Sequence, residues 1–282
     1  MRWNNKAAGL DGLTAEHLKV CSDKLPIMLA MCITTMLIHG YLPQNMISSV
    51  IIPVIKDKCG KITCKDNYRP IAISSIFTKV LEKLLFTRMD NYICTASNQF
   101  GFKKGLGTDM CIFSLKEMIR YYRKKGSSMF ICFLDASKAF DKVNFYKLFN
   151  KLIKRNIPAH ILRIMLSLYT SQKICVEWNN TKSRTFTASN GVRQGAVLSG
   201  HFFNIYIDDL LISLSKLSLG CTVHGIRLNN LAYADDIILL SPFNCLQLLI
   251  NHCEFYAKEH HIDFNLKKTK CIIFVIHFQL QI

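Results

Sequence analysis

The chain has 282 residues, enough to bury a core in one large domain or two modest ones. Half of the residues are apolar, which excludes a fully disordered protein. Lys and Arg total 36 against 19 Asp and Glu, and the net charge of +17 favours a polyanionic partner, most commonly nucleic acid; a solvated basic surface without a partner is the alternative. The twelve cysteines lack zinc-ligand or disulfide spacing, and residues 25–42 fall short of a membrane span, so we expect an intracellular protein, nuclear or cytoplasmic, that binds no membrane.

The first half of the chain is predicted to contain mainly helices. Apolar residues recur at helical spacing after two capping signals, Thr14 and Ser74 or Ser75. In chain order we expect one or two helices over 13–40, a strand over 48–55 whose end is marked by Pro53 and the polar turn KDKCGK, a helix from 76, a glycine-rich basic loop over 99–108, and a helix to about 123.

The second half is predicted to mix strands and helices. In chain order we expect a strand ending at Asp135 with a short helix after it, helices over 145–170 interrupted at Pro158, a hairpin over 173–189, a glycine-bearing loop from 191 that leads into a helix, a hairpin over 225–241, a helix over 245–260, and a strand over 271–278. The irregular alternation with several hairpins predicts an α+β fold with a partly antiparallel sheet.

Two adjacent carboxylates, Asp235 and Asp236, interrupt the apolar, β-prone run LAYADDIILL. Asp is depleted in strands, and a buried ionised carboxylate is costly unless it is paired or binds a metal, so we place the pair at a hairpin turn. Asp135 ends another buried strand, and all three carboxylates can converge on one sheet. Hard cations such as Mg²⁺ would neutralise them, and two such ions support phosphoryl transfer. The alternative for Asp135 alone is a helix cap.

A further pair, Asp208 and Asp209, lies in a segment whose apolar residues have helical spacing. This pattern predicts that both carboxylates lie on or beside the solvent face of that helix. We therefore expect this pair to have no catalytic role.

The segments FLDASKAFDKV, GVRQGAVLSGHFFNIYIDDL and YADD together resemble the palm of reverse transcriptases of non-LTR (LINE-type) retrotransposons. NKAAGLDGLTAEHLK, VIIPVIKDK with NYRPIAISSIFTKVLEKLL, NQFGFKKGLGT and FNLKKTKCIIF resemble other blocks of the same family, in the same order. The resemblance implies one reverse transcriptase domain over 1–282 with right-hand polymerase architecture, mainly fingers over 1–124 and mainly palm over 125–276. No thumb, endonuclease or zinc knuckle is recognised.

The resemblance also implies roles for nine residues. Asp135, Asp235 and Asp236 match the three metal-binding aspartates, with Asp135 and Asp235 as principal ligands of two Mg²⁺ ions, or of Mn²⁺. The substrate-binding residues implied are Lys56 and Arg69 on the triphosphate, Phe140 against a ribose 2′-hydroxyl, Gln194 and Gly195 in a loop close to nucleotide and template, and Lys268 as proton donor to pyrophosphate. Core packing is the alternative for Phe140, and a plain solvated charge for Lys268.

The implied function is RNA-directed DNA polymerase activity, in which dNTPs are added to a DNA primer on an RNA template. Gly200 departs from the family, which usually has Pro there, and is predicted to loosen the start of the following helix. Together with the unrecognised thumb, Gly200 leaves open a truncated, inactive remnant that acts at most as a basic nucleic-acid-binding domain. An RNA-templated RNA polymerase is a third hypothesis, which Phe140 disfavours.

Overall fold

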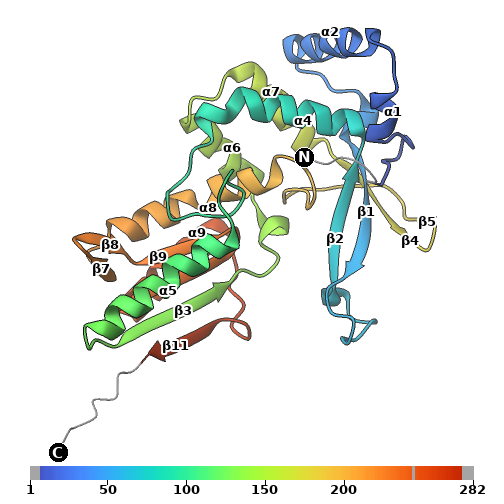
Figure 1. Cartoon of the computed structure of the whole chain (residues 1–282). Helices are drawn as coiled ribbons and strands as arrows, with labels where there is room; N and C mark the ends of the chain where they lie inside the picture. The colour runs from blue at the N-terminus through green and yellow to red at the C-terminus, as the bar shows by residue number, and fades with distance from the viewer. Residues whose placement is uncertain (1–6, 243–244, 275–282) are drawn as a thin grey trace, which may run out of the picture. The chain divides into compact units, whose positions relative to one another are not determined.

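The structure, a computed structural model, describes residues 7–242 and 245–274 and divides the chain into two compact units. Unit 1 comprises residues 1–93 and 145–199, and unit 2 comprises residues 94–144 and 200–282. Each unit therefore combines two stretches of chain that are distant in the sequence (Figure 1).

Unit 1 contains a mixed sheet in the strand order β2-β1-β4-β5, with β6 also paired to β4. β1 pairs antiparallel with β2 and parallel with β4. The helices are α1 (Ala15–Lys19), α2 (Lys24–His39), α3 (Gln44–Ile47), α4 (Ile76–Met89), α6 (Phe145–Lys154) and α7 (Ala159–Thr170), with 3₁₀ turns at Lys65–Asn67 and Asp90–Tyr92. The strands are β1 (Ser48–Ile55), β2 (Tyr68–Ser74), β4 (Lys173–Trp178), β5 (Thr181–Lys182) and β6 (Phe186–Thr187).

The predicted strand over 48–55 is confirmed as β1, whereas β2, which contains Pro70, was not predicted. β1 continues through Pro53 to Ile55, and Pro53 lies directly opposite Pro70 of β2. The backbone N–H of Lys56 donates to the Asn67 carbonyl at 2.8 Å, so these two residues form a hydrogen-bonded pair. Hydrogen-bonded and non-hydrogen-bonded pairs alternate along an antiparallel ladder. Pro53 and Pro70 lie three pairs further along, at a non-hydrogen-bonded position. A residue at such a position does not donate to its partner strand, so proline is tolerated there.

Local signals in the rest of unit 1 are confirmed. Thr14 is the N-cap of α1, and the Oγ of Ser75 caps α4 by accepting a hydrogen bond from a backbone N–H of its first turn at 3.2 Å. The predicted hairpin between β4 and β5 turns at Asn179 and Asn180, which both have positive φ (47° and 61°). Two consecutive residues of positive φ form the type I′ turn that suits antiparallel strands, and Asn tolerates this conformation.

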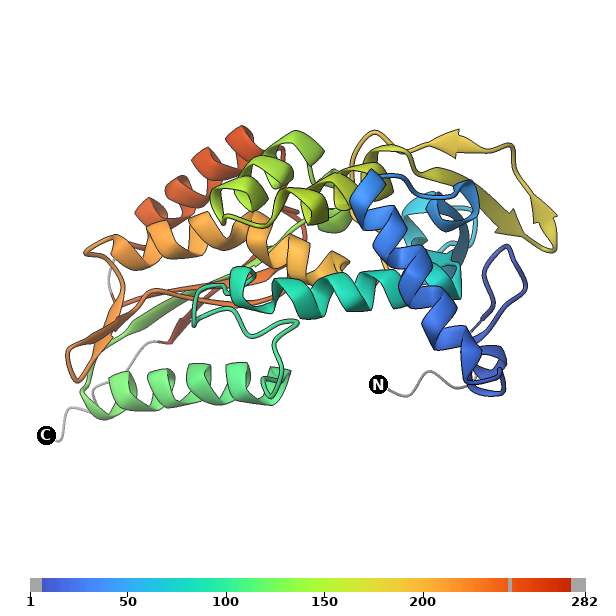
Figure 2. The same ribbon diagram turned by 90° about the horizontal axis from the view of Figure 1, so that it is seen from above.

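Unit 2 contains a sheet in the order β11-β3-β10-β9, in which every neighbouring pair is antiparallel. Figure 2 shows α5 on one face of this sheet and α9 on the other. The helices are α5 (Thr108–Lys124), the 3₁₀ turn Ala139–Lys142, α8 (Ser199–Lys216) and α9 (Leu246–His260). The strands are β3 (Met129–Asp135), β7 (Cys221–Val223), β8 (Ile226–Leu228), β9 (Asn230–Tyr233), β10 (Asp236–Ser241) and β11 (Lys270–Phe274).

The core of unit 2 explains this layering. Met129 and Ile131 of β3 are buried against Met118 and Tyr122 of α5. On α9, the hydroxyl of Tyr256 donates to a backbone carbonyl of α8 at 2.7 Å. The predicted last strand over 271–278 is observed as β11, and its part beyond Phe274 lies outside the described residues.

The α+β class with partly antiparallel sheets is therefore confirmed. Among the residues that the structure describes, no helix is both long enough and apolar enough to cross a membrane.

Candidate active site

Three carboxylates lie at one end of the unit 2 sheet. β3 ends at Asp135 and β10 begins at Asp236, and the two residues are direct partners in the antiparallel register. Directly opposite residues of an antiparallel pair point to the same face of the sheet, with Cβ atoms about 4.5–5.5 Å apart. Asp235 belongs to the two-residue turn between β9 and β10, as the sequence predicted. The register thus brings all three predicted metal ligands together.

Gln99 holds the turn that carries Asp235. Its Oε1 accepts hydrogen bonds from the backbone N–H groups of Ala234 and Gly101, both at 2.9 Å, and its Nε2 donates to the Ala234 carbonyl at 3.2 Å. Gly101 is required because a Cβ there would collide with the backbone of Ala234. Sequence reasoning missed Gln99; its position beside Gly101 in the NQFGF block was the available signal.

The electrostatics of the three carboxylates indicate a site that favours a cation. Burial raises the pKa of Asp235, and the negative charges of Asp236 and Asp135 raise it further, against a backbone hydrogen bond and Lys268. Loss of solvent and the charge of Asp135 also raise the pKa of Asp236. Carboxylates with raised pKa values destabilise the folded state when they ionise, and a bound cation relieves that penalty.

We predict that Asp235→Asn stabilises the metal-free protein at neutral pH. Because the folded-state pKa of Asp235 lies above its unfolded value, the ionised side chain carries a penalty that is complete above the folded pKa. The penalty disappears as the pH falls below the unfolded pKa of about 3.9. Thermal unfolding in EDTA should therefore show a higher midpoint for the variant at pH 7 and no difference near pH 3; an equal gain at both pH values would contradict this origin.

Two further predicted site residues lie in unit 2. The Nζ of Lys268 is 3.6 Å from Oδ2 of Asp135, which places a positive charge beside the carboxylates, and the Lys268 side chain is 67% exposed. Phe140, from the 3₁₀ turn after β3, stacks on Phe203 of α8 with ring centres 5.0 Å apart and stands edge-on to Phe102. Its side chain is half-buried. Phe140 therefore packs against neighbouring aromatic rings, and its remaining exposed part is available for contact with a ligand.

The other four predicted site residues lie in unit 1, two of them in the β1–β2 hairpin and two in a loop beside it. Arg69 pairs with Val54, and Lys56 follows two residues after Val54, so Lys56 and Arg69 lie on one face of the hairpin. The Nζ of Lys56 donates to the Asp66 carbonyl at 2.9 Å, and both basic side chains are exposed. The hairpin therefore presents two positive charges together.

Gln194 and Gly195 lie in a loop that runs along the outer edge of β2. The Gln194 carbonyl accepts a hydrogen bond from the backbone N–H of Ala72 at 2.8 Å. Gly195 has φ +104°, and a Cβ on it would lie 3.2 Å from the Ala72 carbonyl oxygen. Glycine is therefore needed at Gly195 both for its backbone conformation and for the close approach of two backbones.

One prediction about α8 is wrong in part. Asp209 is exposed as expected, but Asp208 is only 2% exposed and accepts a hydrogen bond from the backbone N–H of Ala96 at 2.8 Å. α8 is buried on most sides, so a residue on its polar stripe still faces protein. Asp208 thus anchors the segment that leads to Gln99.

Gly200 lies in the first turn of α8, which begins at Ser199. The ring of Phe102 occupies the space that a Cβ on Gly200 would fill. The helix thus begins at Ser199 without a proline at position 200, and an aromatic ring packs against its first turn.

Among the described residues, no group of three or more His, Cys, Asp or Glu side chains is arranged to hold a metal ion by itself, and this includes Asp135, Asp235 and Asp236. Mg²⁺ usually takes one or two protein carboxylates together with water and substrate phosphates, so an open donor set of carboxylates is the arrangement it suits. Asp135, Asp235 and Asp236 carry oxygen donors of the kind that such hard cations prefer.

Known proteins resemble this chain in sequence over most of its length. The profile of the family "Reverse transcriptase (RNA-dependent DNA polymerase)" matches residues 55–276. The uncharacterized 149 kDa protein of transposon TX1 from Xenopus laevis is 27% identical over 84% of this chain and 18% of its own length. The Pol polyprotein of element R2 from Nasonia vitripennis is 25% identical over 95% of this chain and 26% of its own length. The RNA-directed DNA polymerase of mobile element jockey from Drosophila funebris is 24% identical over 95% of this chain and 30% of its own length. The chain thus spans about a fifth to a third of these relatives.

Solved structures show the same fold at low sequence identity. Apo telomerase from Candida tropicalis, truncated from its C-terminal domain, matches with a TM-score of 0.57 and 11% identity over 90% of this chain and 56% of that one. Telomerase from Candida albicans in complex with a TWJ fragment of telomeric RNA matches with a TM-score of 0.55 and 12% identity over 82% of this chain and 43% of that one. The fold is therefore that of a right-hand polymerase. On the extent of the profile match, the chain belongs to the reverse transcriptase family of RNA-dependent DNA polymerases, enzymes that use divalent metal ions, and its relatives TX1, R2 and jockey are non-LTR retrotransposon proteins.

Proposed function

We propose that the chain is the core of an RNA-directed DNA polymerase, with mainly fingers over 1–124 and mainly palm over 125–276, that adds dNTPs to a DNA primer on an RNA template. The observation that carries this proposal is the meeting of Asp135, Asp235 and Asp236 at one end of the unit 2 sheet, in a chain of this family. The net charge of +17 supports binding of both nucleic-acid strands through their phosphates.

Two Mg²⁺ ions, or Mn²⁺, would be held by Asp135 and Asp235 with Asp236 beside them, and would supply activation of the primer 3′-hydroxyl and charge stabilisation of the triphosphate. The protein's own residues orient the aspartates and neutralise the charge of the triphosphate. Gln99 keeps the Asp235 turn in place through its two hydrogen bonds to Ala234. Lys56 and Arg69 bind the triphosphate, and Lys268 gives a proton to the leaving pyrophosphate.

Primer extension tests this function. The purified chain is supplied with an RNA template, a DNA primer, dNTPs and Mg²⁺, and we expect extension that EDTA stops and added Mg²⁺ restores. Parallel gel-shift measurements establish that the primer–template is bound. Binding without extension would overturn the proposal and favour the inactive nucleic-acid-binding remnant.

We predict that Phe140→Ala weakens discrimination against ribonucleotides. The exposed part of its ring would block a 2′-hydroxyl, and shape discrimination of one small group reaches roughly 10- to 100-fold in kcat/KM. The measurement is the ratio of kcat/KM for a dNTP and its rNTP, because a general loss of activity from disturbed packing on Phe203 cancels in the ratio. Phe102→Ala, which removes the edge-on neighbour of Phe140, is the matched control and should leave the ratio unchanged.

A further inference from the structure

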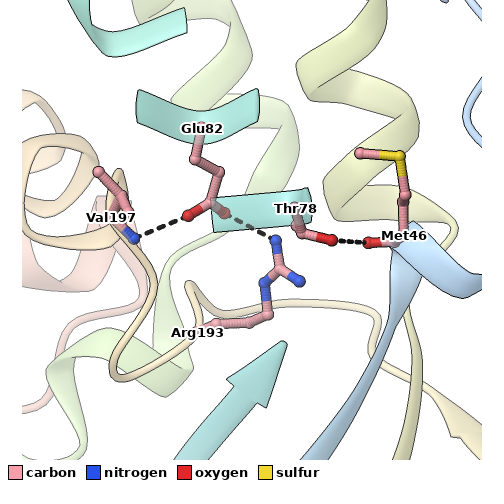
Figure 3. Close-up of polar contacts among 5 residues, drawn as sticks. All are labelled: Met46, Thr78, Glu82, Arg193 and Val197. Atoms are coloured by element: carbon pink, nitrogen blue, oxygen red, sulfur yellow. Dashed lines mark hydrogen bonds and ion pairs between the residues drawn. The ribbon is translucent and has the colours of Figure 1, made fainter. Parts of the chain in front are cut away.

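Glu82, in the middle of α4, is a carboxylate that is completely buried. Its Oε1 accepts a hydrogen bond from Nη2 of Arg193 at 2.8 Å, and its Oε2 accepts one from the backbone N–H of Val197 at 2.7 Å (Figure 3). Arg193 is 5% exposed, and its guanidinium lies 5.7 Å from the centre of the Tyr169 ring. One carboxylate therefore holds two points of a single loop.

Those two points flank the residues predicted to lie close to the nucleotide. The backbone N–H of Ala196 donates to the Arg193 carbonyl at 3.1 Å, which closes a four-residue turn with Gln194 and Gly195 at its centre. The positive φ of Gly195, at the third position, is that of a type II turn. The position of Gln194 is thus set by Glu82 on both sides and by β2 along its edge.

Stability alone gives no reason for charges at these two positions. A buried ion pair costs so much desolvation that well-packed apolar residues of similar size often give equal or greater stability. The charged groups instead fix the geometry of the turn. The Arg193 guanidinium and the Val197 N–H each donate a short hydrogen bond to the Glu82 carboxylate, so both ends of the turn are held at one point.

We infer that Glu82 and Arg193 are positioning residues that hold the Gln194–Gly195 turn in its nucleotide-contacting conformation; this inference rests on the proposed polymerase function. Neither residue needs to touch the substrate. Their effect passes through the turn, so it should appear in the binding of the incoming dNTP more than in the binding of primer–template.

The test uses the double variant Glu82→Leu/Arg193→Met, which removes both charges together and avoids a single buried unpaired charge. Thr78→Val is the matched control, because it removes a different buried hydrogen bond of α4, from the Thr78 Oγ1 to the Met46 carbonyl at 2.7 Å (Figure 3). Thermal unfolding first establishes that both proteins are folded. Hydrogen exchange of the backbone amides of residues 194–197 and the KM for dNTP are then measured.

We expect faster exchange at residues 194–197 and a KM for dNTP raised roughly 10- to 100-fold in the double variant, with unchanged primer–template binding and an unchanged Thr78→Val protein. A folded double variant with wild-type exchange would overturn the inference. If the wild type does not extend primers, the proposed function fails, and the exchange measurement still decides whether the pair holds the turn.

Arg193→Lys covers the case in which the double variant does not fold. Lysine keeps the charge but cannot reproduce the planar guanidinium. We expect intermediate exchange at residues 194–197, and exchange identical to the wild type would overturn the inference.

Discussion

Asp235→Asn is expected to abolish primer extension, lowering kcat by at least roughly 10²–10³-fold, the loss seen when one group that stabilises transition-state charge is removed. The amide has the shape of the carboxylate but no negative charge, so it cannot neutralise a divalent cation as Asp235 would. The same variant should be more stable than the wild type at pH 7 in EDTA, because the raised pKa of Asp235 reflects a penalty that the amide does not carry. Loss of activity with a gain in stability excludes unfolding as the cause.

Asp209→Asn is the matched control for this experiment. Asp209 is an exposed carboxylate of α8 in the same unit, so its substitution removes the same charge from a different place. We expect wild-type extension from this variant. Extension by Asp235→Asn at the wild-type rate would show that the carboxylate does not take part in the chemistry.

Glu82→Gln is expected to lower the free energy of unfolding by about 3–5 kcal/mol, the usual cost of removing one partner of a buried ion pair. The substitution removes the negative charge that pairs with the buried Arg193 guanidinium. The Nε and Nη1 of Arg193 have no hydrogen-bond partner among the described residues, so no other contact of theirs replaces that pairing. Urea denaturation followed by circular dichroism measures the change.

An exposed ion pair provides the comparison. Glu117 and Arg120 of α5 are 2.7 Å apart, but their side chains are 42% and 66% exposed. Glu117→Gln should cost less than about 1 kcal/mol, because solvent screens such pairs. Equal losses in the two variants would contradict the idea that burial makes the Glu82–Arg193 pair important.

Local patterns were sufficient for most elements and for the carboxylates. The caps at Thr14 and Ser75, the Asn179–Asn180 hairpin and the Asp235 turn all depend on residues within a few positions of one another. Such signals act through backbone preferences and short-range hydrogen bonds, which the order of residues alone specifies. β2 was missed because Pro70 locally resembles an interruption; only its partner strand shows that the proline lies at a non-hydrogen-bonded position.

By itself, the sequence determined the family and the α+β class, because the family blocks and the helix and strand patterns are each written in short local segments. It also singled out Asp135, Asp235 and Asp236, whose role as metal ligands stays a prediction. Only the tertiary structure decided that Asp135 lies opposite Asp236, that Gln99 holds the Ala234 turn, and that Glu82 binds Arg193. These partners are about a hundred residues apart or more. Strand register and buried polar pairing over such separations are selected by packing of the whole core, and no local preference of either partner specifies them.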